Sequence, residues 1–158
     1  MLETYKIEFD EKVLKKQLKN TGLEMPKIAQ KMLRGVSAKI RLEVLRNLRG
    51  RVLQKRKGRL YKSVRYYANK DYTAKIMSPT YYGWFQEHGV TIRPRKKEYL
   101  TFKIDGEWKK VKAVTLPARP FMRPAVDVYF SGDGEKAKEV MNTVLQKELN
   151  KVFNKDSK

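Results

Sequence analysis

The sequence predicts an α+β domain, in which a small antiparallel sheet of two hairpins packs against a long amphipathic helix and a C-terminal helix. Three observations predict this class: apolar residues at helical spacing after Pro26, two strand pairs with turn residues between them, and a second helical stripe near the C-terminus. A chain of 158 residues is long enough for one domain. We expect that domain to span residues 1–153, with residues 154–158 as a frayed tail.

The N-terminal segment predicts a short strand followed by a short helix. Apolar residues alternate imperfectly with polar ones over residues 2–9. Asp10 is a suitable N-cap for a helix over residues 11–20, and Thr21 and Gly22 would end it.

A second, longer helix is predicted to begin near Pro26, because proline suits the first turn of a helix. Its apolar stripe consists of Ala29, Leu33, Val36, Ile40, Val44, Leu48 and Val52. From Lys27 to Lys62 the chain has thirteen Lys or Arg residues and a single acid, Glu43. The helix is therefore expected to have one core face and one cationic face.

The densest charge cluster follows this helix, where Gly58 supplies a helix stop. It consists of Lys55, Arg56, Lys57 and Arg59. Four cations within five residues repel one another, so we expect an exposed loop that contacts an anionic partner, either DNA or an acidic neighbouring protein.

Two strands follow the basic cluster. Residues 60–68 and 72–78 are rich in β-branched and aromatic residues, and residues 69–71 form the turn between them. Ser78, before Pro79, is expected to cap a short aromatic helix that ends at Gly89.

The last third of the chain predicts a second hairpin, a stiff connector and a terminal helix. Residues 98–104 and 107–116 are strand-like, and Asp105-Gly106 between them is a strong hairpin signal. The prolines of the connector at residues 115–125 fix their own φ and extend the residue before them. Residues 125–130 and 134–153 are helical in pattern. The second has an apolar stripe of Val140, Val144, Leu145, Leu149 and Val152.

The charge balance predicts an anionic partner, because 37 Lys and Arg residues against 17 Asp and Glu residues give a net charge of +20. One hypothesis is a free basic protein that binds nucleic acid nonspecifically through residues 27–62. Tyr61, Tyr66 and Tyr67 could stack on bases, although aromatic residues at strand spacing usually belong to the core. A membrane-active helix over residues 26–57 is disfavoured, because its apolar face lacks Trp and Phe and is needed for the core. The sequence has neither an apolar run of about 20 residues nor an N-terminal signal-peptide pattern, so we expect no membrane partner.

Catalytic chemistry is not expected. The chain has no cysteine and one histidine, His88, so it cannot form a thiolate site or a histidine pair. The acids that a metal-dependent nuclease would need are scattered at turns and helix ends: Asp105, Glu107, Asp127 and Asp133. We therefore expect no catalytic, cofactor or metal site.

One ordered set of motifs resembles a known family. It comprises the aromatic segment ending in Glu87-His88-Gly89, the entry Thr91-Ile92-Arg93-Pro94, the strand YLTFKI, Pro117-Ala118-Arg119-Pro120-Phe121, and Arg123-Pro124-Ala125. Upstream, a long helix followed by Gly58-Arg59-Leu60 and Ser63 fits the same pattern. Together, residues 27–126 resemble the tail-completion, or head-to-tail joining, proteins of tailed bacteriophages and related virion-morphogenesis proteins. The chain departs from the family at His88-Gly89-Val90, where Gly-Thr or Gly-Gly frequently follows the acidic residue.

The resemblance implies a non-enzymatic structural protein of a phage or prophage. Such a protein completes the tail or joins it to the head at the neck, as a ring around the DNA path, with six copies expected and a monomer before assembly. Its implied partners are head-connector and tail proteins and, nonspecifically, DNA in the channel, and its location is the host cytoplasm during assembly and then the virion neck. The motif residues would form the assembly signature. Within it, two arrangements of Arg119 are open: an ion pair with Glu87 that ties the short helix to the connector, or a side chain that extends into solvent.

Overall fold

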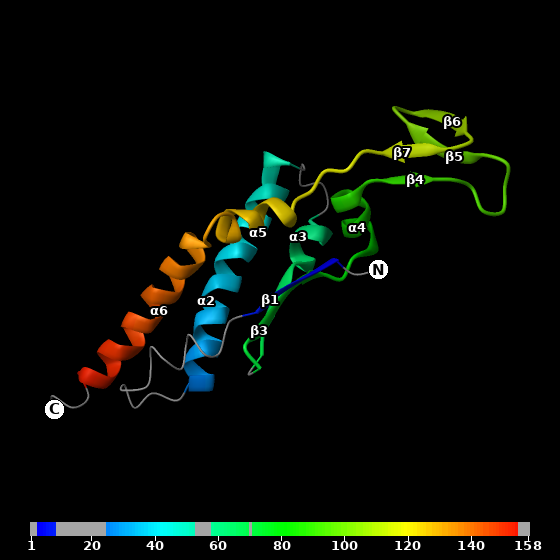
Figure 1. Cartoon of the computed structure of the whole chain (residues 1–158). Coiled ribbons are helices and arrows are strands. Elements are labelled where there is room, and N and C mark those ends of the chain that lie inside the picture. Colours follow the sequence, from blue (N-terminus) through cyan, green and yellow to red (C-terminus); the bar gives the residue numbers. More distant parts are fainter. Residues whose placement is uncertain (1–2, 9–24, 53–57, 70, 155–158) are drawn as a thin grey trace.

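The computed structural model describes residues 3–8, 25–52, 58–69 and 71–154. It confirms the α+β class, with a long central helix, a C-terminal helix and small antiparallel sheets (Figure 1). The helix predicted over residues 11–20 lies outside the described residues. The predicted strand near the N-terminus is confirmed as β1 (Glu3–Glu8).

The central helix α2 (Met25–Arg46) continues through a π-helical turn, η1 (Asn47–Arg51). Its predicted apolar stripe is confirmed: Ala29, Leu33, Val36, Ile40, Val44 and Leu48 are buried, and Val52 is half-buried. Gly50 adopts a φ of 131°, which breaks the regular helix before the basic cluster.

A three-stranded antiparallel sheet packs on α2, with β3 (Thr73–Ser78) between β1 and β2 (Arg65–Ala68). The turn between β2 and β3 is held by Asp71, whose carboxylate accepts hydrogen bonds from the Thr73 amide at 3.2 Å and hydroxyl at 2.6 Å. The hydroxyl bond lowers the pKa of Asp71. The predicted first hairpin is thus confirmed.

The strand predicted over residues 60–68 is correct only in its second half. Residues Arg59–Ser63 form a short helix, α3, entered through Gly58 at a φ of 70°. The Ser63 hydroxyl donates a hydrogen bond to the Leu60 carbonyl oxygen at 2.7 Å. Such a local side-chain bond competes with the backbone hydrogen bonds of a strand. Although these residues favour a strand, Gly58 and the Ser63 hydroxyl favour the short helix that is observed.

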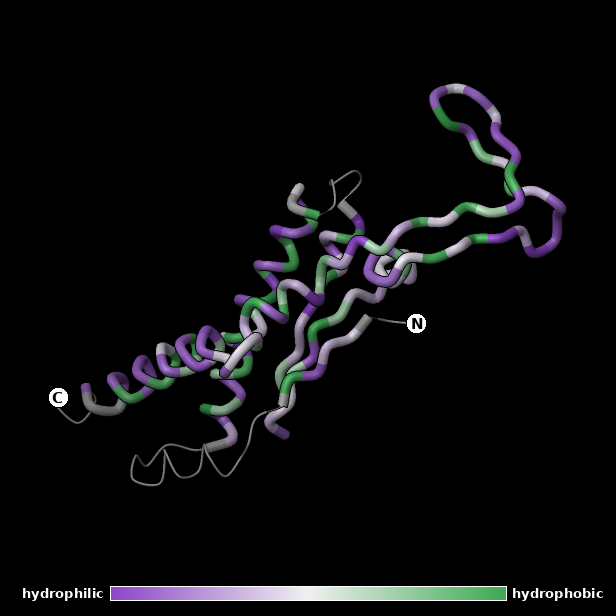
Figure 2. Tube along the Cα trace, turned by 45° about the horizontal axis from the view of Figure 1, so that its top comes forward, coloured by the Kyte–Doolittle hydropathy of each residue, from purple (hydrophilic) through white to green (hydrophobic). Residues whose placement is uncertain are grey.

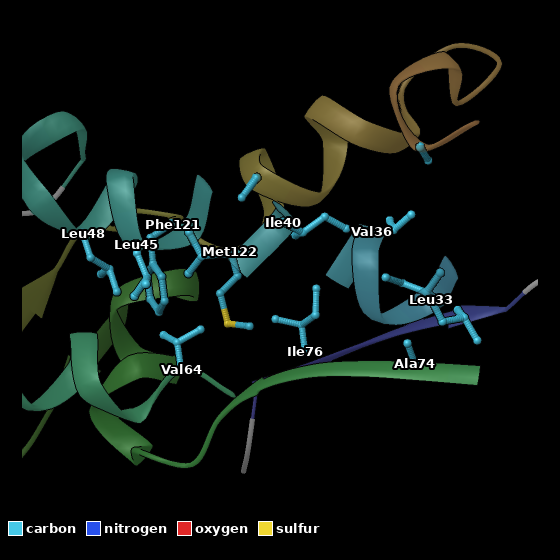
Figure 3. Packing of buried hydrophobic residues seen from close by; sticks show 14 residues of the cluster. Leu33, Val36, Ile40, Leu45, Leu48, Val64, Ala74, Ile76, Phe121 and Met122 are labelled. Atoms are coloured by element: carbon cyan, nitrogen blue, oxygen red, sulfur yellow. The ribbon is translucent and has the colours of Figure 1, made fainter. Parts of the chain in front are cut away.

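Two helices complete the core. Helix α5 (Arg123–Phe130) and helix α6 (Glu135–Phe153) both pack on α2, and α6 runs alongside it (Figure 1). Gly35 allows the close approach, because a Cβ there would lie 2.9 Å from a methyl of Val144. Figure 3 shows the main cluster, in which Phe121 and Met122 enter between α2 and β3.

The second predicted hairpin is confirmed as β5 (Leu100–Ile104) and β6 (Glu107–Val111), joined by Asp105-Gly106 with φ values of 50° and 90°. It forms a sheet of its own. A strand pair absent from the prediction, β4 (Val90–Ile92) with β7 (Val114–Leu116), carries this hairpin away from the core. We call residues 90–116 the arm. Figures 1 and 2 show the arm projecting from one end of the molecule, opposite α6.

Candidate functional site

The motif residues meet where the arm joins the core, beginning with the aromatic helix α4 (Tyr81–His88). The predicted cap by Ser78 is wrong: the N-cap is Thr80, and Ser78 is buried in β3. The Ser78 hydroxyl instead bonds with the hydroxyls of Ser63 at 2.9 Å and Thr80 at 3.0 Å. Gly83 packs against these groups, since a Cβ there would lie about 3 Å from both Ser78 and Thr80 hydroxyls. These contacts fix α4 against the sheet.

Glu87, in the last turn of α4, is the centre of the site. Its side chain is buried, with 5% of the residue exposed, and its carboxylate accepts three backbone hydrogen bonds. Oε2 accepts from the Phe121 amide at 2.7 Å and the Met122 amide at 2.9 Å, while Oε1 accepts from the Arg123 amide at 2.8 Å. The Tyr5 hydroxyl donates to Oε1 at 3.5 Å, which adds a contact from β1. One carboxylate thereby joins α4, the connector, and the N-terminal strand.

The three amides belong to the start of α5, where backbone N–H groups have no intrahelical acceptor. The N-cap residue is Met122, and its side chain makes no capping hydrogen bond. Glu87 therefore caps α5 from another helix, and its charge is favourable at the positive end of the helix dipole. Pro124, in the first turn, has no N–H and requires no acceptor.

The predicted ion pair between Glu87 and Arg119 is not formed. No ion pair joins these two described side chains, and the Arg119 side chain is exposed. The backbone N–H of Arg119 donates instead to the Gln86 carbonyl at 2.7 Å. The connector is joined to α4, but through its backbone amides and not through the Arg119 side chain. The Phe121 and Met122 amides are buried and need an acceptor, which Glu87 supplies.

Gly89 makes the exit from α4 into the arm possible. It ends the helix, as predicted, with a φ of 74° and a ψ of 166°. A Cβ at this position would lie 2.8 Å from the Ala118 nitrogen and 3.0 Å from the Leu116 carbonyl oxygen. The glycine therefore allows both strands at the base of the arm to leave the core side by side.

Phe121 anchors the connector in the core and is fully buried. Figure 3 shows it beside Leu45 and Leu48, with Met122 near Val64. Its carbonyl accepts a hydrogen bond from the side chain of Asn47, which is itself buried, at 2.9 Å. Sequence reasoning missed Asn47 and Tyr5, because a polar residue in a helix and a tyrosine in a strand give no pattern that names a distant partner.

The remaining motif residues are not buried at this base, and Arg93 and Pro94 lie beyond it, after the far end of β4. Arg93, Pro117, Arg119 and Arg123 are exposed, and Pro94, Pro120 and Pro124 are half-buried. His88 is exposed, stacks on Trp84 with ring centroids 4.9 Å apart, and lies 3.2 Å from the Trp84 carbonyl. At the start of the same helix, Tyr81 is 69% exposed and its ring contacts the rings of Tyr82 and Phe85, so α4 presents an aromatic surface.

The basic cluster is described only in part, since Lys55, Arg56 and Lys57 lie outside the described residues. Arg59 is exposed at the start of α3. Several cations of the long helix have partners within the chain: Lys31 with Glu148, Arg41 with the Val64 carbonyl, Arg46 with Glu43, and Arg49 with the Tyr61 ring. The face of α2 predicted to meet an anion is thus partly used for packing, which weakens the hypothesis of a nucleic-acid track over residues 27–62.

The described part of the chain was searched for a metal-ion site and for a membrane-spanning helix, and neither was found. No three His, Cys, Asp or Glu side chains among those residues are grouped to hold a metal ion. Asp105 and Glu107 lie at the tip of the arm, while Asp127 and Asp133 lie in and after α5. None of the helices within the described ranges is both long enough and apolar enough to cross a bilayer.

In comparisons with known proteins, no protein-family model, curated protein or solved structure matches the chain.

Proposed function

We propose that the protein is a non-enzymatic structural component of a tailed phage or prophage, which completes the tail or joins it to the head at the neck as a ring around the DNA path. The motif that resembles the tail-completion family is the starting point of this proposal. One observation carries it further: three parts of the motif that are separated in the sequence meet at one place in the structure. Glu87, Gly89 and the connector at residues 117–123 are joined by buried hydrogen bonds and close packing at the base of the arm.

The arm itself supports an assembly role. An isolated two-stranded ribbon is marginally stable in water, so ribbons that leave a domain usually pack on a partner. Leu100, Phe102 and Val111 are half-buried on one face of the β5–β6 hairpin, and Ile104 on that face is 44% exposed. With Tyr81 on α4, these residues provide apolar surface that a neighbouring subunit would cover.

An arm-shortened variant tests this proposal. Ile92 and Val114 are directly paired in the β4–β7 ribbon, so residues 93–113 can be replaced by Asn-Gly, which favours a two-residue hairpin turn. The Glu87 contacts lie outside the replaced segment, and the core should fold normally.

The gene is deleted in the phage or lysogen that encodes it and complemented with either form. We expect deletion to yield heads and tails that are not joined, or incomplete tails, by electron microscopy. Wild-type protein should restore complete particles, and the arm-shortened form should not. A deletion that leaves the number of complete particles unchanged would refute the proposal.

A further inference from the structure

The two faces of the β5–β6 hairpin differ in character. Residues directly opposite each other in an antiparallel pair share a face, and the register places Lys103 opposite Trp108 and Thr101 opposite Lys110. All four are exposed, and Trp108 is 71% exposed. We call these four residues the tryptophan face. The opposite face holds the half-buried apolar side chains.

The tryptophan face is cationic as well as aromatic. Lys103 lies across the ladder from Trp108, and Lys110 lies two residues further along the same strand and on the same side. The nearby acids are directed elsewhere by the backbone: Glu107 belongs to the opposite face by alternation, and Asp105 lies in the turn. Trp108 therefore shares its face of the hairpin with two lysines and with no acid.

The surroundings strengthen this positive field. Residues 90–116 contain eight Lys or Arg and three acidic residues. Four of these eight cations are exposed in the loop before β5: Arg93, Arg95, Lys96 and Lys97. Among its acids, Glu98 is engaged by Tyr99, whose pKa is raised by that hydrogen bond.

This composition fits a polyanion better than a protein surface. The cores of protein interfaces are depleted in lysine and need several adjoining apolar side chains, whereas this face offers one tryptophan among lysines. Nucleic-acid surfaces combine cations for the phosphates with exposed aromatic rings on which bases stack. A two-stranded ribbon is also narrow enough to enter the major groove of a duplex.

We infer that the tryptophan face binds nucleic acid, with Lys103 and Lys110 at phosphates and Trp108 against a base or sugar. This inference does not rest on the proposed function, because a free nucleic-acid-binding protein could use the same face. It also places the contact on the arm and not on the helix over residues 27–62. Single-stranded and duplex DNA share the phosphate chemistry, and the experiment below separates them.

The two tryptophans of the chain make Trp108 a direct reporter. In full-length protein with Trp84→Phe, Trp108 is the sole source of indole fluorescence. The variant is titrated with oligo(dT) of about 20 nucleotides, a length that exceeds a typical single-strand site. A duplex of the same length and poly-L-glutamate are titrated in parallel. We expect quenching of Trp108 on DNA and weaker binding as salt is raised, with stronger quenching by oligo(dT) if bases stack on the ring.

Substitutions on this face then assign the contact. Lys103→Gln with Lys110→Gln removes two phosphate contacts, so the slope of log K against log salt should fall by about 1.4 for single strands or about 1.8 for duplex. Trp108→Ala should weaken binding of labelled oligo(dT) about tenfold, within the range for loss of one stacked base. Lys136→Gln with Lys147→Gln is the matched control, because both lysines are exposed on α6 at the far end of the molecule (Figure 1).

Three results would overturn the inference. The first is DNA binding with unchanged Trp108 fluorescence, and the second is equal loss of affinity and slope in the arm and α6 variants. The third is poly-L-glutamate binding as tight as DNA, which would assign the face to an acidic protein surface. Each result leaves the particle assay unaffected, so failure here and failure of the proposed function are distinguishable.

Discussion

Replacement of Glu87 by glutamine should destabilise the protein by about 3–5 kcal/mol, because glutamine has one acceptor oxygen where the carboxylate has two. If that oxygen keeps the Phe121 and Met122 amides, the new NH₂ group faces the Arg123 amide. A buried amide without an acceptor costs about 1–3 kcal/mol. Loss of the negative charge weakens each of the two remaining bonds by about 1 kcal/mol.

Urea unfolding followed by circular dichroism measures this loss as a change in midpoint at constant m-value. Glu139→Gln is the matched control, because Glu139 is exposed on α6 and its substitution should change the unfolding free energy by less than about 0.5 kcal/mol. Equal stability of the Glu87→Gln and Glu139→Gln proteins would refute the role assigned to the carboxylate.

A double-mutant cycle separates the observed cap from the ion pair expected from the sequence. Arg119→Ala keeps the backbone N–H that bonds to Gln86 and removes an exposed side chain, so its effect should be within about 0.5 kcal/mol. Its effect should add to that of Glu87→Gln. A coupling energy above about 1 kcal/mol between the two substitutions would instead support an ion pair between Glu87 and Arg119.

Two further predictions concern the base of the arm and the α2–α6 interface. Gly89→Ala should cost at least about 2 kcal/mol more than Gly132→Ala in the same urea assay. Both glycines have positive φ, but a Cβ at 89 meets the Ala118 nitrogen at 2.8 Å and a Cβ at 132 meets nothing within 4 Å; equal costs would contradict the packing. Hydrogen bonds from Lys151 and Lys31 lower the pKa of Glu148 below its ordinary 4.5. Its stabilising effect is therefore present above pH 4.5 and lost as pH falls through the lower folded value. The stability difference between wild type and Glu148→Gln should shrink between pH 6 and pH 3, and a constant difference would argue against the interaction.

Most of the helices and strands among the described residues were predictable, because each has a local signal. The stripe on α2 recurs at helical spacing, and Asp105-Gly106 marks its hairpin through the positive φ that both residues adopt. Residues 60–63 were predicted as strand because Leu60 and Tyr61 have strand propensity. A glycine entry and a serine bond to a carbonyl outweighed that propensity.

The separation of the strands into three sheets, with β4 and β7 paired at the base of the arm, was not predictable in the same way. Strands β4 and β7 have three residues each and pair across a separation of 24 residues at Thr91 and Thr115, so neither gives a local period. The sequence predicts a partner for Glu87 in the connector, and the structure places that partner there. The chemistry of that partner was misjudged, because sequence spacing does not show which backbone amides a fold leaves without acceptors.

The structure therefore separates two sets of residues that the sequence presents as one continuous motif. At the base of the arm, Glu87 and Gly89 are enclosed by backbone, and changes there should lower the unfolding free energy first. At the tip, Lys103, Trp108 and Lys110 are exposed and do not belong to the core. Substitutions there should therefore weaken nucleic-acid binding and leave the unfolding free energy nearly constant. A tip variant that unfolds as readily as Glu87→Gln would show that the arm packs on its own core. In that case the exposed tryptophan face could not serve as a binding surface.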